Sequence, residues 1–298
     1  MIRIRIQAFK FYHISFIKSY SSLKTKVMAI VKNFLQITGS IKGVSFYTRV
    51  GSDKVIMRTK GGAKKETIQN GPRFEKLRKH QVEWQGCVRF AQTMRDAIGE
   101  TYRLSNFNLT PVWTGMGRQI LKLDTVTEIG QRFLRFSQCR QEMEGYNLNK
   151  TYPIASILQV SPLAELNRDT LSATVSLPRI NTASDLQNIQ RLPYFRLIIC
   201  LGMVSDMMYN PDGIVHKYQP VNDELNGKKQ SVLSDWHSTN DILPAHVLSV
   251  QIDEYAIPLL TDDVTVLLSM GIEFGNVGFG GVIEPVKHAG CGKILLCR

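Results

Sequence analysis

The residues with the clearest chemical meaning in this sequence are cations. Ten Lys and Arg side chains fall between residues 49 and 79, and the aromatic residues Tyr47, Phe74 and Trp84 are interleaved with them. Cations on a hairpin and its adjoining loop can contact phosphates, which releases counterions and makes binding sensitive to salt. The alternative interpretation is a solvated face or a contact between subunits. The predicted surface for nucleic acid or another anionic partner consists of Arg49, Lys54, Arg58, Lys60, Lys64, Lys65, Arg73, Lys76 and Lys79.

Two short groups of polar residues could support catalysis. Asp235 and Asp241 place carboxylates near His237, and a carboxylate can orient a catalytic or metal-binding imidazole. Asp262 and Asp263 could bind a hard cation or act as paired acids. We favour a polar loop for the first group and a turn for the second. An enzyme site would require the two groups to meet within a few ångströms in one cleft.

The longer motifs of enzymes, phosphate-binding loops and metal sites are missing from the sequence. It contains no His-x-x-x-His, no Gly-x-Ser-x-Gly and no Gly-x-Gly-x-x-Gly. Its five cysteines are scattered without a Cys-x-x-Cys pair, which argues against a disulfide framework and a zinc site. We therefore expect no enzyme activity, no cofactor and no metal. Free thiols favour a reducing, cytoplasmic compartment, and no apolar run approaches the roughly 18–20 residues that span a membrane.

The charge of the chain changes sign between its two halves. Residues 1–150 carry 27 Lys and Arg against 10 Asp and Glu, and residues 151–298 carry 10 against 15. This split predicts a basic module over residues 28–150 and a second domain over residues 151–298. Residues 1–27 hold six cations and no acid. They predict a basic leader that is disordered or lies before the true start at Met28, with a mitochondrial presequence as the alternative.

The basic module reads as a hairpin followed by helices. Apolar and polar residues alternate over 44–49 and 54–58, and residues 50–53 have turn chemistry, which predicts a β-hairpin. Apolar residues at spacings of three, four and seven predict a helix over about 72–99, with Phe74 and Trp84 on its core face. These two aromatic residues are therefore expected to pack rather than stack on a ligand. Further helices are predicted over about 111–123 and 134–143.

Short strands dominate the rest of the chain. Strand patterns recur between turn residues, among them 171–177, 194–209, 247–252 and 264–274. Strands at this density, with few helical stretches, predict an antiparallel β-sandwich. The expected fold class is α+β, a basic β-hairpin plus helices module followed by this sandwich. Exposed sheet edges could mediate assembly into a homo-oligomer.

A set of short motifs is similar to a known pattern. The motifs are the segment 38–47, Arg58-Thr59-Lys60-Gly61-Gly62, Phe74 with Arg78, Leu123-Asp124-Thr125, Gly130-Gln131-Arg132 and Gly271-Ile272-Glu273-Phe274. Together they resemble a family of uncharacterised proteins from Bacteroidota, and residues 28–150 carry most of the resemblance. The resemblance implies a bacterial or phage-derived source, and it supplies no activity, cofactor or catalytic residue.

The function expected from these features is that of a non-enzymatic binding or structural protein, derived from a phage or another mobile element. A sandwich without a convergent polar motif is a common scaffold for binding and structural proteins, including those of phages and other mobile elements, although a fold does not fix a function. The alternative is a nucleic-acid-binding protein that uses the basic N-terminal module. Salt-dependent binding would separate the two hypotheses.

Overall fold

The chain divides into two compact units. The computed structural model describes residues 28–31, 38–49, 54–59 and 61–298, and the units are Met1–Ile68 and Gln69–Arg298. The leader predicted for residues 1–27 and the turn predicted at 50–53 lie outside the described residues. Helices combined with antiparallel sheets confirm the predicted α+β class.

The first unit contains a four-stranded antiparallel sheet in the order β1-β4-β3-β2. The register from Val44↔Thr59 to Thr48↔Val55 joins β3 to β4, which confirms the predicted pairing of these segments. A second hairpin, which the sequence pattern did not separate, joins β2 to β3. Its turn residues Lys42 and Gly43 have φ of 39° and 86°, as a two-residue hairpin turn requires. The strands are β1 (Met28–Val31), β2 (Gly39–Ile41), β3 (Val44–Thr48) and β4 (Val55–Thr59), and helix α1 (Lys65–Asn70) follows in sequence.

Two of the three predicted helices are present in the second unit. They are α2 (Glu75–Ala97) and α3 (Thr110–Leu123), and each starts close to a proline that suits a first helical turn. The short helix predicted over 134–143 is present only as two 3₁₀ segments, Phe136–Gln138 and Arg140–Met143, because tertiary hydrogen bonds take up the backbone groups around them. Leu134 exchanges two backbone hydrogen bonds with Met207, and the Asp206 carboxylate accepts the Ser137 N–H at 2.8 Å. The shorter helical segments are Pro72–Phe74, Gly99–Leu104, Phe136–Gln138, Arg140–Met143, α4 (Ile154–Ile157), Glu254–Leu259 and Phe279–Gly281.

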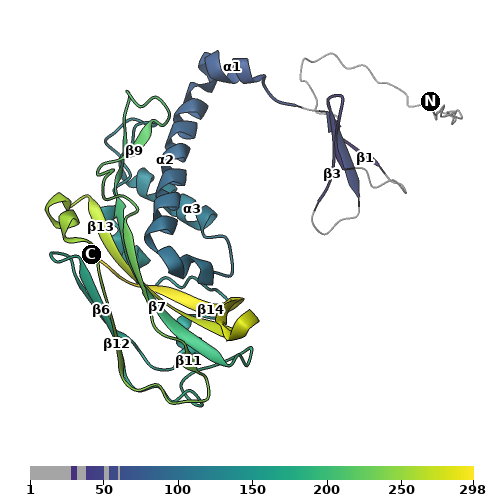
Figure 1. Cartoon of the computed structure of the whole chain (residues 1–298). Coiled ribbons are helices and arrows are strands. Elements are labelled where there is room, and N and C mark those ends of the chain that lie inside the picture. The colour runs from purple at the N-terminus through teal and green to yellow at the C-terminus, as the bar shows by residue number, and fades with distance from the viewer. Residues whose placement is uncertain (1–27, 32–37, 50–53, 60) are drawn as a thin grey trace, which may run out of the picture. The chain divides into compact units, whose positions relative to one another are not determined.

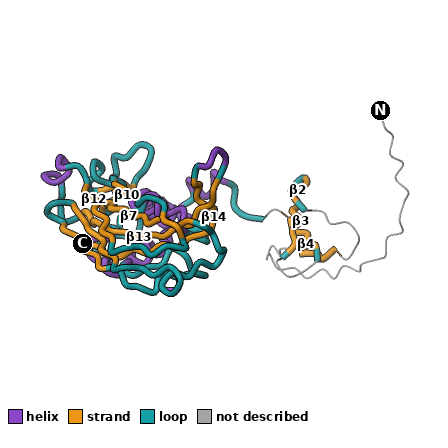
Figure 2. Tube along the Cα trace, turned by 60° about the horizontal axis from the view of Figure 1, so that its bottom comes forward, coloured by secondary structure: helices purple, strands orange, loops and turns teal. Residues whose placement is uncertain are grey.

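The strands of the second unit form three antiparallel sheets. The large sheet has the order β10-β7-β13-β14 with β11 paired to β7, the small sheet has the order β12-β6-β5, and β8 pairs with β9. Figure 2 shows β7, β10 and β13 side by side in the middle of this unit. The strands are β5 (Leu163–Asn167), β6 (Ser172–Leu177), β7 (Tyr194–Ser205), β8 (Met207–Tyr209), β9 (Tyr218–Pro220), β10 (Lys229–Leu233), β11 (His237–Ser238), β12 (His246–Gln251), β13 (Val264–Val277) and β14 (Ile283–Cys297).

The helices and the sheets of this unit share one body. One hydrophobic core lies between the large and small sheets, and a second lies between the large sheet and α2 and α3. Figure 1 shows α2 and α3 on one side of β7 and β13, with β6 and β12 on the other. The boundary expected at residue 150 therefore differs from the division of the chain, which falls after Ile68. Apolar side chains between Cys87 and Leu148 are buried against the large sheet, so this segment belongs with the strands.

Strand β7 is the centre of this arrangement because both of its faces are buried. Leu197, Ile199, Leu201 and Met203 face the small sheet, and Val204 faces the helices. On the helix side Cys200 donates its S–H to the Ala97 carbonyl oxygen at 3.4 Å. A strand that is covered on both sides needs a continuous apolar run rather than alternation, and this is the pattern over 194–205.

Candidate functional site

The predicted cationic surface is divided between the two units. Six of its nine residues belong to the first unit, and Arg73, Lys76 and Lys79 belong to the second. Lys60 lies outside the described residues. All nine cations were predicted to belong to one folded module, and in the structure they belong to two units.

Three of the predicted cations lie on one face of the first sheet. Successive side chains of a strand alternate between faces. Arg49 directly follows β3, so continued alternation places it on the side of Tyr47. Lys54 directly precedes β4, and the same alternation places it on the side of Arg58. The register pairs Ser45 with Arg58, which places both sets together. We call Arg49, Lys54, Arg58 and Tyr47 the basic strand face.

The three cations of this face are exposed to solvent. Arg49, Lys54 and Arg58 are all exposed, and Tyr47 is half-buried. The Arg58 guanidinium carbon lies 5.3 Å from the centre of the Tyr47 ring, within the range of a cation–π interaction. The face therefore presents an aromatic ring among positive charges, which suits a ligand with planar groups and phosphates.

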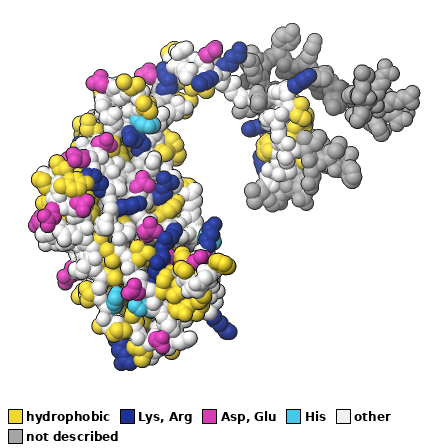
Figure 3. Space-filling view, viewed as in Figure 1, with side chains coloured by type: hydrophobic (Ala, Val, Ile, Leu, Met, Phe, Trp, Pro, Cys, Tyr) yellow, Lys and Arg dark blue, Asp and Glu magenta, His cyan; other side chains and the backbone are white. Residues whose placement is uncertain are grey.

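The net positive charge of the protein belongs to this first unit. Residues 1–68 carry 14 Lys and Arg against 2 Asp and Glu, and residues 69–298 carry 23 of each. The net charge of +12 is therefore that of the first unit, and the second unit is formally neutral. On the face seen in Figure 3, cationic and acidic side chains are mixed over the second unit.

The predicted cations of the second unit are less available to a ligand. Lys79 makes ion pairs with Glu75 at 3.0 Å and with Glu128. These partners raise the pKa of Lys79, with the hydrogen bond that Lys79 donates to Glu128 contributing most. Arg73 and Lys76 are exposed near the start of α2. This helix start is therefore a weaker candidate than the basic strand face.

A cleft of about 490 Å³ lies between α2 and α3, and we call it the α2–α3 cleft. Its lining includes Trp84, whose exposed fraction is 50%, although the sequence pattern placed it on a core face. The predicted apolar face is buried only toward the C-terminal end of α2, and Leu77 and Val88 are also exposed. The lining residues are His80, Gln81, Glu83, Trp84, Gln85, Cys87, Arg118, Leu121, Lys122 and Arg132.

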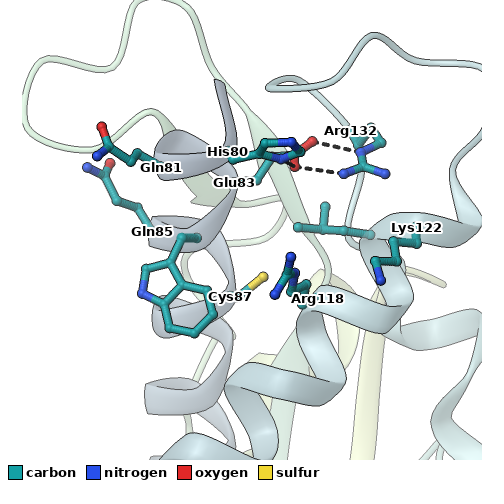
Figure 4. A pocket seen from close by; sticks show the side chains of 10 residues that line it. His80, Gln81, Glu83, Gln85, Cys87, Arg118, Lys122 and Arg132 are labelled. Atoms are coloured by element: carbon teal, nitrogen blue, oxygen red, sulfur yellow. Dashed lines mark hydrogen bonds and ion pairs between the residues drawn. The ribbon is translucent and has the colours of Figure 1, made fainter. Parts of the chain in front are cut away.

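One buried ion pair organises the end of this cleft. Arg132 donates two hydrogen bonds of 2.7 Å to the Glu83 carboxylate, which also accepts the Gly130 N–H at 2.8 Å. Burial alone raises the pKa of Glu83, but the hydrogen bonds from Arg132 and Gly130 outweigh it and hold this pKa below its usual value. Figure 4 shows the Glu83–Arg132 pair beside His80, and Arg118 pointing toward Cys87. Sequence reasoning missed this pair because its partners are 49 residues apart.

The cleft also contains two cations without counterions. Arg118 and Lys122 are exposed, and neither has a hydrogen bond or ion pair with any residue in the described part of the chain. They are four residues apart on α3, so they lie on the same side of that helix. The Cys87 thiol in the cleft is neutral, because burial raises its pKa to about 12.

The residues considered for catalysis do not meet. His237 pairs with Phe195 near one end of β7, and Val264, which follows Asp263, pairs with Ser205 at the other end. Ten residues of strand separate these points, which is about 33 Å. The described residues contain no group of three or more His, Cys, Asp or Glu that could hold a metal ion. The cysteines are all free thiols.

Comparison of this chain with protein-family models, curated proteins and solved structures gives no match. The resemblance to a Bacteroidota family and the phage or mobile-element origin therefore stay predictions. Among the described residues, no helix is both long enough and apolar enough to cross a bilayer.

Proposed function

We propose that this chain is a non-enzymatic protein that binds single-stranded nucleic acid through its basic strand face. The observation that carries the proposal is the exposure of Arg49, Lys54 and Arg58 around Tyr47 on one face of a sheet. The unit that presents this face also holds the whole net charge of the protein. This role joins the two functions expected from the sequence, that of a non-enzymatic binding protein and that of a nucleic-acid-binding protein.

Single strands fit this face better than duplexes do. A single strand offers unpaired bases that stack on aromatic rings and a phosphate backbone that cations can follow. Stacking does not depend on base identity, so we expect little sequence preference. Phosphate contacts release counterions, and affinity should therefore fall as salt rises.

The test is a titration of fluorescent oligothymidylate at several salt concentrations with the full chain. In the triple variant Arg49→Ala, Lys54→Ala, Arg58→Ala, three phosphate contacts are lost. Each contact to a single strand contributes about 0.7 to the slope of log affinity against log salt, so the slope should fall by about 2. Tyr47→Ala should weaken binding by about 5- to 150-fold through lost stacking, with the slope unchanged.

The matched control removes three cations from the second unit. The variant Arg73→Ala, Lys76→Ala, Lys79→Ala changes the net charge by the same amount but leaves the basic strand face intact. We expect it to keep a slope close to that of the wild type. Equal losses in the two triple variants would mean that total charge, and not this face, governs binding. Binding that is absent at low salt, or that favours duplex DNA, would also contradict the proposal.

A further inference from the structure

We propose that the α2–α3 cleft is a second binding site, whose ligand is a nucleoside phosphate. The site belongs to the second unit and uses none of the residues of the basic strand face. Its volume of about 490 Å³ falls within the range of pockets that hold small ligands. The ligand class follows from three features of the lining.

The first feature is an exposed aromatic wall. Trp84 lines the cleft and is 50% exposed, whereas Trp113 is fully buried. A half-exposed indole leaves apolar surface in contact with water, which is unfavourable. A flat ring that stacks on the indole would cover this surface. Tryptophan also gives strong contacts to ring systems in binding sites.

The second feature is an excess of positive charge that no residue of the cleft neutralises. Glu83 is the one acid among the lining residues, and Arg132 already binds it in a bidentate pair. Arg118 and Lys122 remain, with no ion-pair partner among the described residues. Two cations on one side of α3 suit a phosphate group, because an Arg guanidinium can bind it through two hydrogen bonds and a Lys ammonium as a point charge.

The third feature is a set of neutral hydrogen-bonding groups near the aromatic wall. Gln81 and Gln85 line the cleft beside Trp84, and an amide side chain offers both donors and an acceptor. Such groups can pair with the edge of a nucleobase. The floor contributes Leu121 and the neutral thiol of Cys87, so it presents no negative charge to the ligand.

These features together fit a planar base joined to a phosphate. The same chemistry occurs in a free mononucleotide and at the 5′ end of a single strand, and the experiment separates the two sources. The probes are AMP, GMP, CMP and UMP, with adenosine and inorganic phosphate as partial ligands. A 5′-phosphorylated oligothymidylate is tested against its unphosphorylated form. This arm uses the chain with Arg49, Lys54 and Arg58 replaced by Ala, so that strand binding at the first unit does not interfere.

Binding is measured by calorimetry and by quenching of tryptophan emission in the full-length protein. A ring that stacks on Trp84 should quench emission, and Trp84→Phe should abolish the quenching while binding persists. Trp84→Ala should weaken binding by about 5- to 150-fold. Lys122→Ala should weaken nucleotide binding and leave adenosine binding unchanged.

The control variant is Lys76→Ala, which removes an exposed cation of α2 outside the cleft. It should bind like the wild type. Binding of mononucleotides, or of the phosphorylated strand alone, supports the site and identifies the source of the ligand. The inference is overturned if no probe binds, if inorganic phosphate binds as tightly as the nucleotides, or if Trp84→Ala and Lys122→Ala both bind like the wild type. Loss of oligonucleotide binding at the basic strand face leaves these outcomes unchanged, so failure of one proposal is distinguishable from failure of the other.

Discussion

The replacement of Gly202 by Ala should destabilise the second unit strongly, because α2 lies directly on β7 at this position. A Cβ atom at residue 202 would overlap the carbonyl oxygen of Ala97, and it would lie 2.6 Å from the Ala97 carbonyl carbon and 2.8 Å from its Cα. Carbon atoms in contact are normally about 3.5–4.0 Å apart. The helix would therefore have to move by about 1 Å, since the obstacle is backbone and cannot rotate away.

The expected cost follows from this displacement. Overpacking of a core costs about 1–3 kcal/mol, and the backbone contact places this substitution at the upper end, at about 3 kcal/mol or more. For a unit of this size, each kcal/mol lowers the melting temperature by about 2–4 °C. Gly202→Ala should therefore melt about 6–12 °C below the wild type.

The matched control is the same substitution at Gly115 in α3. A Cβ atom there would meet nothing within 4 Å, and Ala is favoured over Gly in a helix by about 1 kcal/mol. Gly115→Ala should therefore stabilise the protein. Urea denaturation, followed by circular dichroism and by tryptophan emission, measures both variants. If Gly202→Ala changes the free energy of unfolding by less than about 0.5 kcal/mol, the seating of α2 on β7 is refuted.

Three further predictions concern buried ionisable groups. Burial raises the pKa of Asp206 to about 6, which is above the pKa of this carboxyl in the unfolded chain. Its contribution to stability is therefore complete below pH ~4 and falls by about 3 kcal/mol as pH rises through 6. In urea denaturation, Asp206→Asn should reduce the difference in the free energy of unfolding between pH 4 and pH 7. Glu83→Gln should cost about 3 kcal/mol at pH 7 because it leaves Arg132 without its charged partner. The pKa of Glu83 lies below its usual value, so the stabilisation that Glu83 provides should disappear as pH falls below about 4. This account is contradicted if the free energy of unfolding of the variant falls with acid as steeply as that of the wild type. Burial raises the pKa of the thiols, to about 12 for Cys87, so at pH 8 the half-buried Cys139 should react first with a thiol reagent and the buried thiols only after unfolding.

The helix predictions show how far periodicity reaches. The spacing of apolar residues identified α2 and α3, because side chains three and four apart share a helix face. It did not identify which part of that face is covered. Ala91, Met94 and Ile98 are buried, but Trp84 is half exposed. The pattern identifies which side of the helix is apolar. Only the neighbouring elements decide which part of that side, along the length of the helix, is buried.

The candidate sites show the same division. The cations at 49, 54 and 58 were evident from residue type, and their common face follows from strand alternation once the register of β3 and β4 is known. The α2–α3 cleft gave no local signal. Arg118 and Lys122 come from a helix about 35 residues after Trp84, and Arg132 reaches Glu83 across 49 residues. Contacts at such separations depend on helix packing, which no short window of sequence encodes.

Residue types and their periods determined the α+β class, the main helices and strands, and the presence of excess positive charge near the N-terminus, because these depend on neighbours along the chain. Tertiary structure decided where the units divide, since the buried apolar side chains between Cys87 and Leu148 share one core with residues of β7, β13 and β14. It also decided that the net charge belongs to the first unit alone. Burial is a property of surfaces brought together from distant segments, and a linear pattern specifies what can be buried without specifying its partner.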